Sequence, residues 1–183
     1  KLAQLRDGTS LDGATRTALG TMYEQVRGLI DLSSSFLMTT SADHGLLNTS
    51  AFKPFDVAAL VQSRIAFAKG SATERDVTVE TNITSATRAQ VIGDEDRLRL
   101  VFDNLISNAI KYSTPNSRVV ISYAHEKTMH AFSVQDSGIG IPKDEIASIF
   151  GGFKRASNAI HSGVTGTGFG LYIAKRIVDF HNG

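Results

Sequence analysis

The pattern of apolar and polar positions is most regular between Asp94 and Ser113. Apolar residues recur there at intervals of three and four, which is the period of one face of an α-helix. They are Leu98, Val101, Phe102, Leu105, Ala109 and Ile110. Asp94 follows a glycine and can cap the first turn. The spacing therefore predicts an amphipathic helix over 94–113 that presents one apolar face to a core.

The opposite face of this helix carries Asn104, Asn108 and Lys111, at positions i, i+4 and i+7. Asparagine is a poor helix former, so two asparagines here lower helix propensity without a gain in packing. An amide oxygen can ligate a hard cation, and an ammonium group can meet phosphate oxygens. Both an ordinary surface helix and a metal–phosphate site are compatible with this segment alone.

A second apolar repeat of three and four runs from Ala14 to about Thr39. This spacing is typical of the seam of a coiled coil or a helical bundle. Such a seam requires a partner helix, from the same chain or from a second subunit. The alternative is one long core helix of the globular domain. The polar stretch Thr40–Asn48 that follows predicts a linker.

Further elements follow from local patterns. We expect helices over 56–69 and 143–150, a final helix ending at His181, strands over 77–83 and 90–92, and a hairpin of strands 119–125 and 129–135. Helices and strands do not alternate one for one. This order predicts an α+β fold with a mixed, mostly antiparallel sheet that helices cover on one face.

Composition narrows the classes of function. The chain has 183 residues, of which 42% are hydrophobic and 20% charged, and this fits one globular domain with an appendage. A net charge of +1 argues against nucleic acid as the main partner. The absence of cysteine excludes disulfides and thiolate metal sites, and no apolar run has the length of a membrane-spanning helix.

Two glycine-rich turns carry candidate chemistry. The first, Asp136 to Pro142, places Gly138 and Gly140 around an isoleucine, where backbone can approach a flat ligand closely and Asp136 can accept from an exocyclic amine. The second, Gly166–Leu171, opens a helix, whose free N–H groups and positive dipole end suit a polyphosphate. It is neither a dinucleotide-binding fingerprint nor a P-loop. Each turn alone is also compatible with a purely structural role.

Taken in order, the motifs N-x-x-x-N-A-x-K-Y, D-x-G-x-G-I-P, F-x-x-F-x-R and G-T-G-x-G-L resemble the catalytic, ATP-binding domain of sensor histidine kinases, over about Phe52 to Gly183. This resemblance implies the Bergerat-type two-layer α/β sandwich, preceded by a helical-hairpin fragment. It places the partial dimerisation and phosphoacceptor hairpin with its linker at 1–48 and the catalytic domain at 49–183. ATP and Mg²⁺ are the implied cofactors.

The resemblance also implies roles for single residues. The expected catalytic residues are Asn108 as the Mg²⁺ ligand, Asn104 one turn earlier and Lys111 as the phosphate contact. The expected nucleotide-binding residues further include Tyr112, Asp136 on the adenine amine, Gly138, Gly140, Ile141, Phe150 and Arg155. The glycine turn would add Gly166, Thr167, Gly168, Phe169, Gly170 and Leu171, with residues 156–165 as a lid.

In such a kinase the γ-phosphate goes to a histidine on a helical hairpin and then to a response regulator. The resemblance implies a homodimer through the N-terminal helix and a cytoplasmic location in a parent protein that can be membrane-anchored. The phosphoacceptor histidine is expected outside this chain, since His125 is interpreted as a surface residue. We expect the isolated chain to bind Mg·ATP without autophosphorylation.

The sequence departs from the family pattern at Gly151-Gly152 and Lys154, inside the third motif, and the usual terminal strands after His181 are missing. An autonomous ATPase is disfavoured, because such enzymes carry a glutamate base where Asn104 stands. A serine/threonine kinase of the anti-sigma type shares the nucleotide motifs, but the N-terminal helical seam favours the sensor kinase. A regulatory module that binds ATP without phosphotransfer is the remaining alternative.

Overall fold

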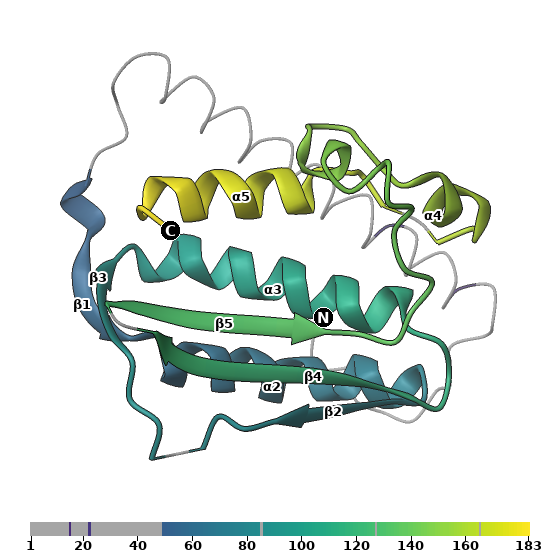
Figure 1. Cartoon of the computed structure of the whole chain (residues 1–183). Helices are drawn as coiled ribbons and strands as arrows, with labels where there is room; N and C mark the ends of the chain where they lie inside the picture. The colour runs from purple at the N-terminus through teal and green to yellow at the C-terminus, as the bar shows by residue number, and fades with distance from the viewer. Residues whose placement is uncertain (1–14, 16–21, 23–48, 85, 127, 165) are drawn as a thin grey trace.

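The computed structural model describes residues 15, 22, 49–84, 86–126, 128–164 and 166–183 (Figure 1). The expected seam helix over 14–39 and the expected linker over 40–48 therefore lie outside the described residues, apart from Thr15 and Met22. The division of the chain at residue 48 remains a prediction.

The described elements follow one another along the chain without strict alternation. They are η2 (Thr49–Ala51), β1 (Lys53–Asp56), α2 (Val57–Glu74), β2 (Val77–Thr81), β3 (Gln90–Gly93), α3 (Glu95–Tyr112), β4 (Ser117–Glu126), β5 (Met129–Gln135), η3 (Ser148–Phe150), α4 (Ser157–His161) and α5 (Gly170–Phe180). None of the helices among these residues is long and apolar enough to cross a membrane.

The strands form two small sheets. In the larger sheet β4 is central, parallel to β2 and antiparallel to β5, so the sheet is mixed. The β4–β5 pairing runs from Val120↔Gln135 to Glu126↔Met129, which confirms the predicted hairpin. Strands β1 and β3 pair antiparallel in a separate two-stranded sheet. The α+β class with a mixed sheet is confirmed.

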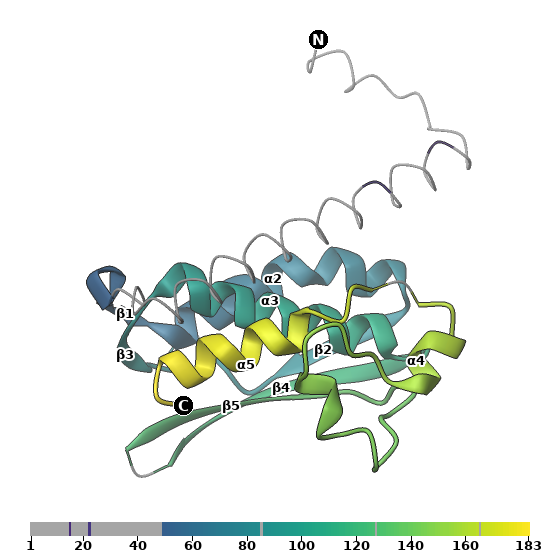
Figure 2. The same ribbon diagram turned by 90° about the horizontal axis from the view of Figure 1, so that it is seen from above.

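Three long helices form a layer on one face of the larger sheet. Figure 2 shows α2, α3 and α5 side by side above the sheet, with α3 in the middle. Val119 and Ile121 of β4 point towards the helices and are 0% and 1% exposed, whereas Thr78 and Arg118 lie on the open face. The fold therefore has two layers, and one face of the sheet remains exposed to solvent.

Aspartates cap the two helices that follow strands β1 and β3. Asp94 Oδ1 accepts a hydrogen bond from Arg97 N at 3.0 Å, as predicted for the start of α3. Asp56 Oδ1 accepts from Ala58 N and also from Ala89 N, at 3.0 and 3.1 Å. One carboxylate thus caps α2 and ties its start to the segment before β3.

Two local predictions were wrong. The expected helix over 143–150 is a series of turns ending in η3, because most of its hydrogen bonds join residues three apart, such as Glu145 N to Pro142 O and Ser148 N to Glu145 O. The segment 156–164, for which the sequence predicted a lid and no helix, contains the short helix α4. Contacts from distant segments, described below, stabilise that helix.

Candidate functional site

Helix α3 presents different polar residues to its two neighbouring helices. Arg64 Nε of α2 donates to Asp103 Oδ1 at 2.7 Å. One residue later, Asn104 faces the start of α5: its Oδ1 lies 2.7 Å from the position that a Cβ on Gly170 would occupy. Asp103 and Asn104 therefore point in different directions, and only Asn104 faces the glycine turn.

The carboxyl end of α3 fixes the first glycine turn. Tyr112 O accepts from Ile139 N at 3.2 Å, and Ser113 forms a β-bridge with Gly138. A Cβ on Gly138 would stand 2.2 Å from Tyr112 O, so only glycine fits without a backbone shift. Asp136 Oδ1 accepts from Gly138 N at 2.9 Å, which orients the exposed carboxylate at the rim of this turn.

Three hydrogen-bond donors converge beside Gly166. The position of a Cβ on Gly166 would lie 3.1 Å from Lys111 Nζ, 3.6 Å from Tyr112 Oη and 4.0 Å from Arg155 Nε. The Lys111 ammonium also lies over the Tyr112 ring, 5.7 Å from its centroid. Arg155 Nε is buried and, within the described part of the chain, has no hydrogen-bond partner. A buried donor without a partner beside a second cation suits an anionic ligand.

Asn108, one turn before Tyr112, is half-buried. No group of three or more His, Cys, Asp or Glu side chains able to hold a metal ion occurs among the residues that the structure describes. Mg²⁺ accepts few protein ligands and completes its shell with waters and substrate phosphates. A single amide oxygen, such as that of Asn108, therefore fits Mg²⁺ only together with a phosphorylated ligand.

The second glycine turn is packed against the third motif. A Cβ on Gly168, which has φ +76°, would meet Lys154 O at 2.7 Å. Phe153 has φ +62° and is 71% exposed, and its ring packs edge-on against Phe169 at 4.0 Å between centroids. Phe169 is only 5% exposed and belongs to the core between α3 and α5. The Phe169 side chain therefore has a packing role.

Two residues that sequence reasoning missed connect the segment 156–164 to earlier loops: Asn158 to the first glycine turn, and Glu145 to the segment that follows this turn. Asn158 Nδ2 donates to Ile139 O and Gly140 O, at 3.1 and 2.9 Å. Glu145 Oε2 accepts from Ser157 N at 2.7 Å. The partners are 12 to 19 residues apart and follow no helical or strand spacing, so no sequence pattern indicates them.

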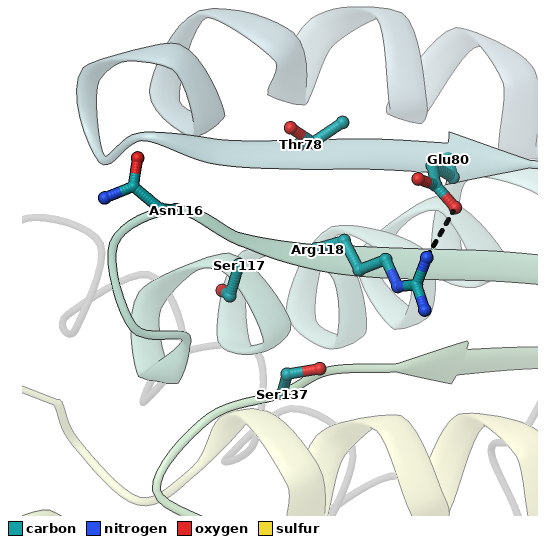
Figure 3. A pocket seen from close by; sticks show the side chains of 6 residues that line it. All are labelled: Thr78, Glu80, Asn116, Ser117, Arg118 and Ser137. Carbon is teal, nitrogen blue, oxygen red and sulfur yellow. Dashed lines mark ion pairs between the residues drawn. The ribbon is translucent and has the colours of Figure 1, made fainter.

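A different region of the surface contains a shallow hollow of about 410 Å³ on the open face of the sheet (Figure 3). Glu80 and Arg118 point towards one another there and form a 4.0 Å ion pair. The hollow is lined by Thr78, Glu80, Asn116, Ser117, Arg118 and Ser137. It contains none of the predicted site residues, and its arginine already has a carboxylate partner.

The predicted site residues instead gather where the carboxyl end of α3 meets the amino end of α5, near α4 (Figure 1). Asn104, Lys111, Tyr112, Gly138, Arg155, Gly166 and Gly170 are connected there by the contacts given above. Phe150 and Ile141 are 41% and 45% exposed. The structure gives no contact that joins these two side chains to the donor cluster.

Comparison with known proteins indicates the family of this part of the chain. Residues 93–183 match the model of the family described as histidine kinase-, DNA gyrase B- and HSP90-like ATPases. Residues 93–183 are a domain of this ATPase family. The match to the ATPase domain begins just before α3 and includes both glycine turns.

The relatives of the chain are sensor histidine kinases. Sensor histidine kinase GacS of Pseudomonas protegens is 28% identical over 165 residues, which cover 88% of this chain and 18% of that protein. Sensor histidine kinase WalK of Bacillus subtilis is 42% identical over 92 residues, or 49% of this chain and 15% of that protein. The chain thus spans less than a fifth of the length of these relatives.

A solved structure supports the same fold. The mycobacterial sensor histidine kinase MprB matches with a TM-score of 0.60 and 26% identity, over 72% of this chain and 80% of that one. The ATPase domain of this chain is therefore similar in both sequence and fold to sensor histidine kinases.

Gly138→Ala is expected to lower the free energy of unfolding by about 1–3 kcal/mol, because the new Cβ collides with backbone rather than with a flexible side chain. Gly70→Ala is the matched control: it lies inside α2 with no atom within 4 Å of a new Cβ, and should raise stability by about 0.5–1 kcal/mol. Urea denaturation measures both. Wild-type stability of Gly138→Ala would contradict the close approach.

The contact of Glu145 with Ser157 should depend on pH. The side-chain and backbone hydrogen bonds from Ser157 hold the pKa of the Glu145 carboxyl below its ordinary value of 4.5. The contact is thus fully present above that value and is lost as the pH falls through the lowered pKa. The amide shift of Ser157, followed by NMR, should report this transition. Glu145→Gln should abolish it, and a midpoint above the ordinary value would contradict the assignment.

Proposed function

We propose that this chain contains the ATP-binding kinase core of a two-component sensor histidine kinase, which binds Mg·ATP and transfers the γ-phosphate to a histidine on a helical hairpin outside this chain. The observation that carries the proposal is the convergence of Lys111 Nζ, Tyr112 Oη and Arg155 Nε beside Gly166, immediately before the glycine-rich start of α5. Membership of residues 93–183 in the ATPase family supports ATP as the ligand.

In this proposal each part of the site has one task. Asn108 would ligate Mg²⁺, and Lys111 and Arg155 would meet phosphate oxygens together with the backbone N–H groups of the turn 166–170. Asp136 would accept from the adenine amine, in a pocket shaped by Gly138, Gly140 and Ile141. Phosphoryl transfer needs mainly positioning and charge stabilisation, which such a set of donors and one metal ligand can supply.

Water activation for hydrolysis is not part of the proposal. The amide of Asn104 cannot act as a base, and its Nδ2 donates to Leu100 O at 2.9 Å. The neighbouring carboxylate of Asp103 is paired with Arg64 on the other side of the helix. These two contacts favour a kinase, which passes the phosphoryl group to a partner, over an autonomous ATPase.

The proposal extends to the organisation of the parent protein. Residues 1–48 would be the later part of the dimerisation and phosphoacceptor hairpin with its linker, and residues 49–183 the catalytic domain. The partners would be the phosphoacceptor helix of the kinase, a response regulator and a second copy of the chain. The similarity to GacS over 88% of this chain supports this organisation.

Calorimetric titration with ATP, in the presence and absence of Mg²⁺, tests the binding site. Incubation with γ-labelled ATP and a separate helical hairpin that carries a phosphoacceptor histidine tests the transfer. We expect binding, transfer of label to the hairpin and no label on the chain itself. Binding without transfer would favour a regulatory module, and absence of binding would contradict the proposal.

Asp136→Asn should weaken ATP binding about 10–100-fold, because a hydrogen bond from the adenine amine to a charged acceptor contributes about 1.5–3 kcal/mol. Asp144→Asn is the matched control, since Asp144 is also an exposed aspartate but lies outside the turn 136–142. The same calorimetry should show equal affinities for Asp144→Asn and wild type. Equal affinities for Asp136→Asn and wild type would refute the adenine contact.

Asn108→Ala should lower the affinity for Mg·ATP by about 10–100-fold, the loss expected when a metal ligand or its support is removed. With Mg²⁺ chelated, the variant and the wild type should bind ATP equally. A loss of the same size with and without Mg²⁺ would show that Asn108 does not act through the metal.

A further inference from the structure

Two polar residues attach helix α4 to the first glycine turn and to the segment that follows this turn. The Asn158 carboxamide donates two hydrogen bonds, to Ile139 O and Gly140 O. The Glu145 carboxylate accepts from Ser157 N. We call Glu145 and Asn158, with these bonds, the α4 latch.

The position of α4 depends on such contacts because so short a helix is not stable in isolation. It has five residues, far fewer than an isolated helix needs for stability in water, and its N-cap residue Ala156 provides no side-chain cap. Glu145 supplies the missing acceptor for Ser157 N from outside the helix. On its other side, α4 buries Ala156 and Ala159 against Ile149, Tyr112 and Leu171. The latch and this small apolar cluster together fix where α4 lies.

Helix α4 in turn holds Arg155. The guanidinium Nη2 donates to Ala159 O of α4 at 3.0 Å and also to Val164 O. A second nitrogen of the guanidinium group, Arg155 Nε, is buried without a partner in the described part of the chain and lies on the side of Gly166. A guanidinium donates in a fixed planar fork, so the two carbonyls that hold Nη2 also fix the direction of Nε–H.

We propose that the α4 latch positions Arg155 for the polyphosphate of the bound nucleotide, so that Glu145 and Asn158 are positioning residues of the ATP site. The inference rests on the proposed function and adds that binding of the phosphates depends on the α4 latch. Contacts to the phosphates depend on the latch, whereas contacts to the nucleoside do not. A purely structural role of the two residues would affect both kinds of contact equally.

The test compares Mg·ATP with adenosine as ligands of wild type, Asn158→Ala, Glu145→Ala and Arg155→Ala, by calorimetry or NMR titration. We expect Asn158→Ala and Glu145→Ala to bind Mg·ATP about tenfold more weakly and to keep the wild-type affinity for adenosine within about twofold. Amide exchange at Ser157 should become faster in both variants, because its hydrogen-bond partner is lost or displaced.

Three further variants separate positioning from a general loss of structure. Glu145→Gln keeps an oxygen acceptor for Ser157 N and should restore most of the ATP affinity lost in Glu145→Ala. Asn158→Ala combined with Arg155→Ala should bind ATP no more weakly than Arg155→Ala alone, because the latch acts through the arginine. Asp144→Ala, beside Glu145 and exposed, should match wild type throughout.

Two sets of results would overturn the inference while the proposed function stands: an unchanged ATP affinity of the latch variants, or an equal loss of ATP and adenosine affinity. Additive losses in the double variant would overturn it as well. If the wild type binds no ATP, the proposed function fails and the inference fails with it. Selective loss of ATP affinity, rescued by Glu145→Gln, would establish the latch.

Discussion

The structure depends on one helix that must bury two apolar faces at once. Phe102, Ile106 and Ile110 of α3 pack into the core with α2 and the sheet, and Val101 packs into a second core with Ile173 and Ile177 of α5. Exposure of either face would cost about 1.5–3 kcal/mol for each large side chain. A helix with two buried faces has only a narrow strip left for polar chemistry. That strip carries Asn104, Asn108 and Lys111, and its orientation is set by the packing on both sides.

The carboxyl end of the same helix organises the loops. Tyr112 contributes its carbonyl to the first glycine turn, its ring to the cluster beneath α4 and its hydroxyl to the donor group beside Gly166. Three loop segments therefore lie against Tyr112: residues 138–139, residues 156–159 and residue 166. Because these segments pack closely against the end of α3, glycine is needed where a Cβ would collide with backbone, as at Gly138. Packing around Tyr112 thus constrains parts of all three loop segments.

The regular spacing of apolar residues along the sequence made the longer helices and strands predictable. The apolar stripe and Asp94 cap of α3, the β4–β5 hairpin and the α+β class were all predicted, since each depends on neighbours in sequence. The parallel pairing of β2 with β4 has no local signal, and neither has the ion pair between Arg64 and Asp103, 39 residues apart. The predicted helix over 143–150 was wrong because most of its hydrogen bonds close turns between residues three apart. Helix α4 was missed because the acceptor for Ser157 N comes from Glu145, outside the helix.

For the site, the roles that the resemblance implies for single residues stay predictions, and the structure adds the contacts around those residues. Gly138 and Gly170 belong to the two glycine-rich turns of the sequence. In the structure, a Cβ at these positions would stand close to Tyr112 O and to Asn104 Oδ1, respectively. Phe169 was expected beside the nucleotide but has its ring in the core. The connections of Glu145 and Asn158 depend on how two loops meet, and this is determined only when the whole chain is folded.

Chemical-shift mapping by NMR tests the central claim most directly, because it reports where a nucleotide binds without assuming any residue's role. Titration with Mg·ATP should shift the carboxamide signals of Asn104 and Asn108 and the amides of residues 166–170 and 136–141. The amides of Thr78, Glu80 and Arg118, which line the hollow on the opposite face of the sheet, should stay unchanged. Shifts concentrated at that hollow, or absent from the glycine turns, would contradict the account.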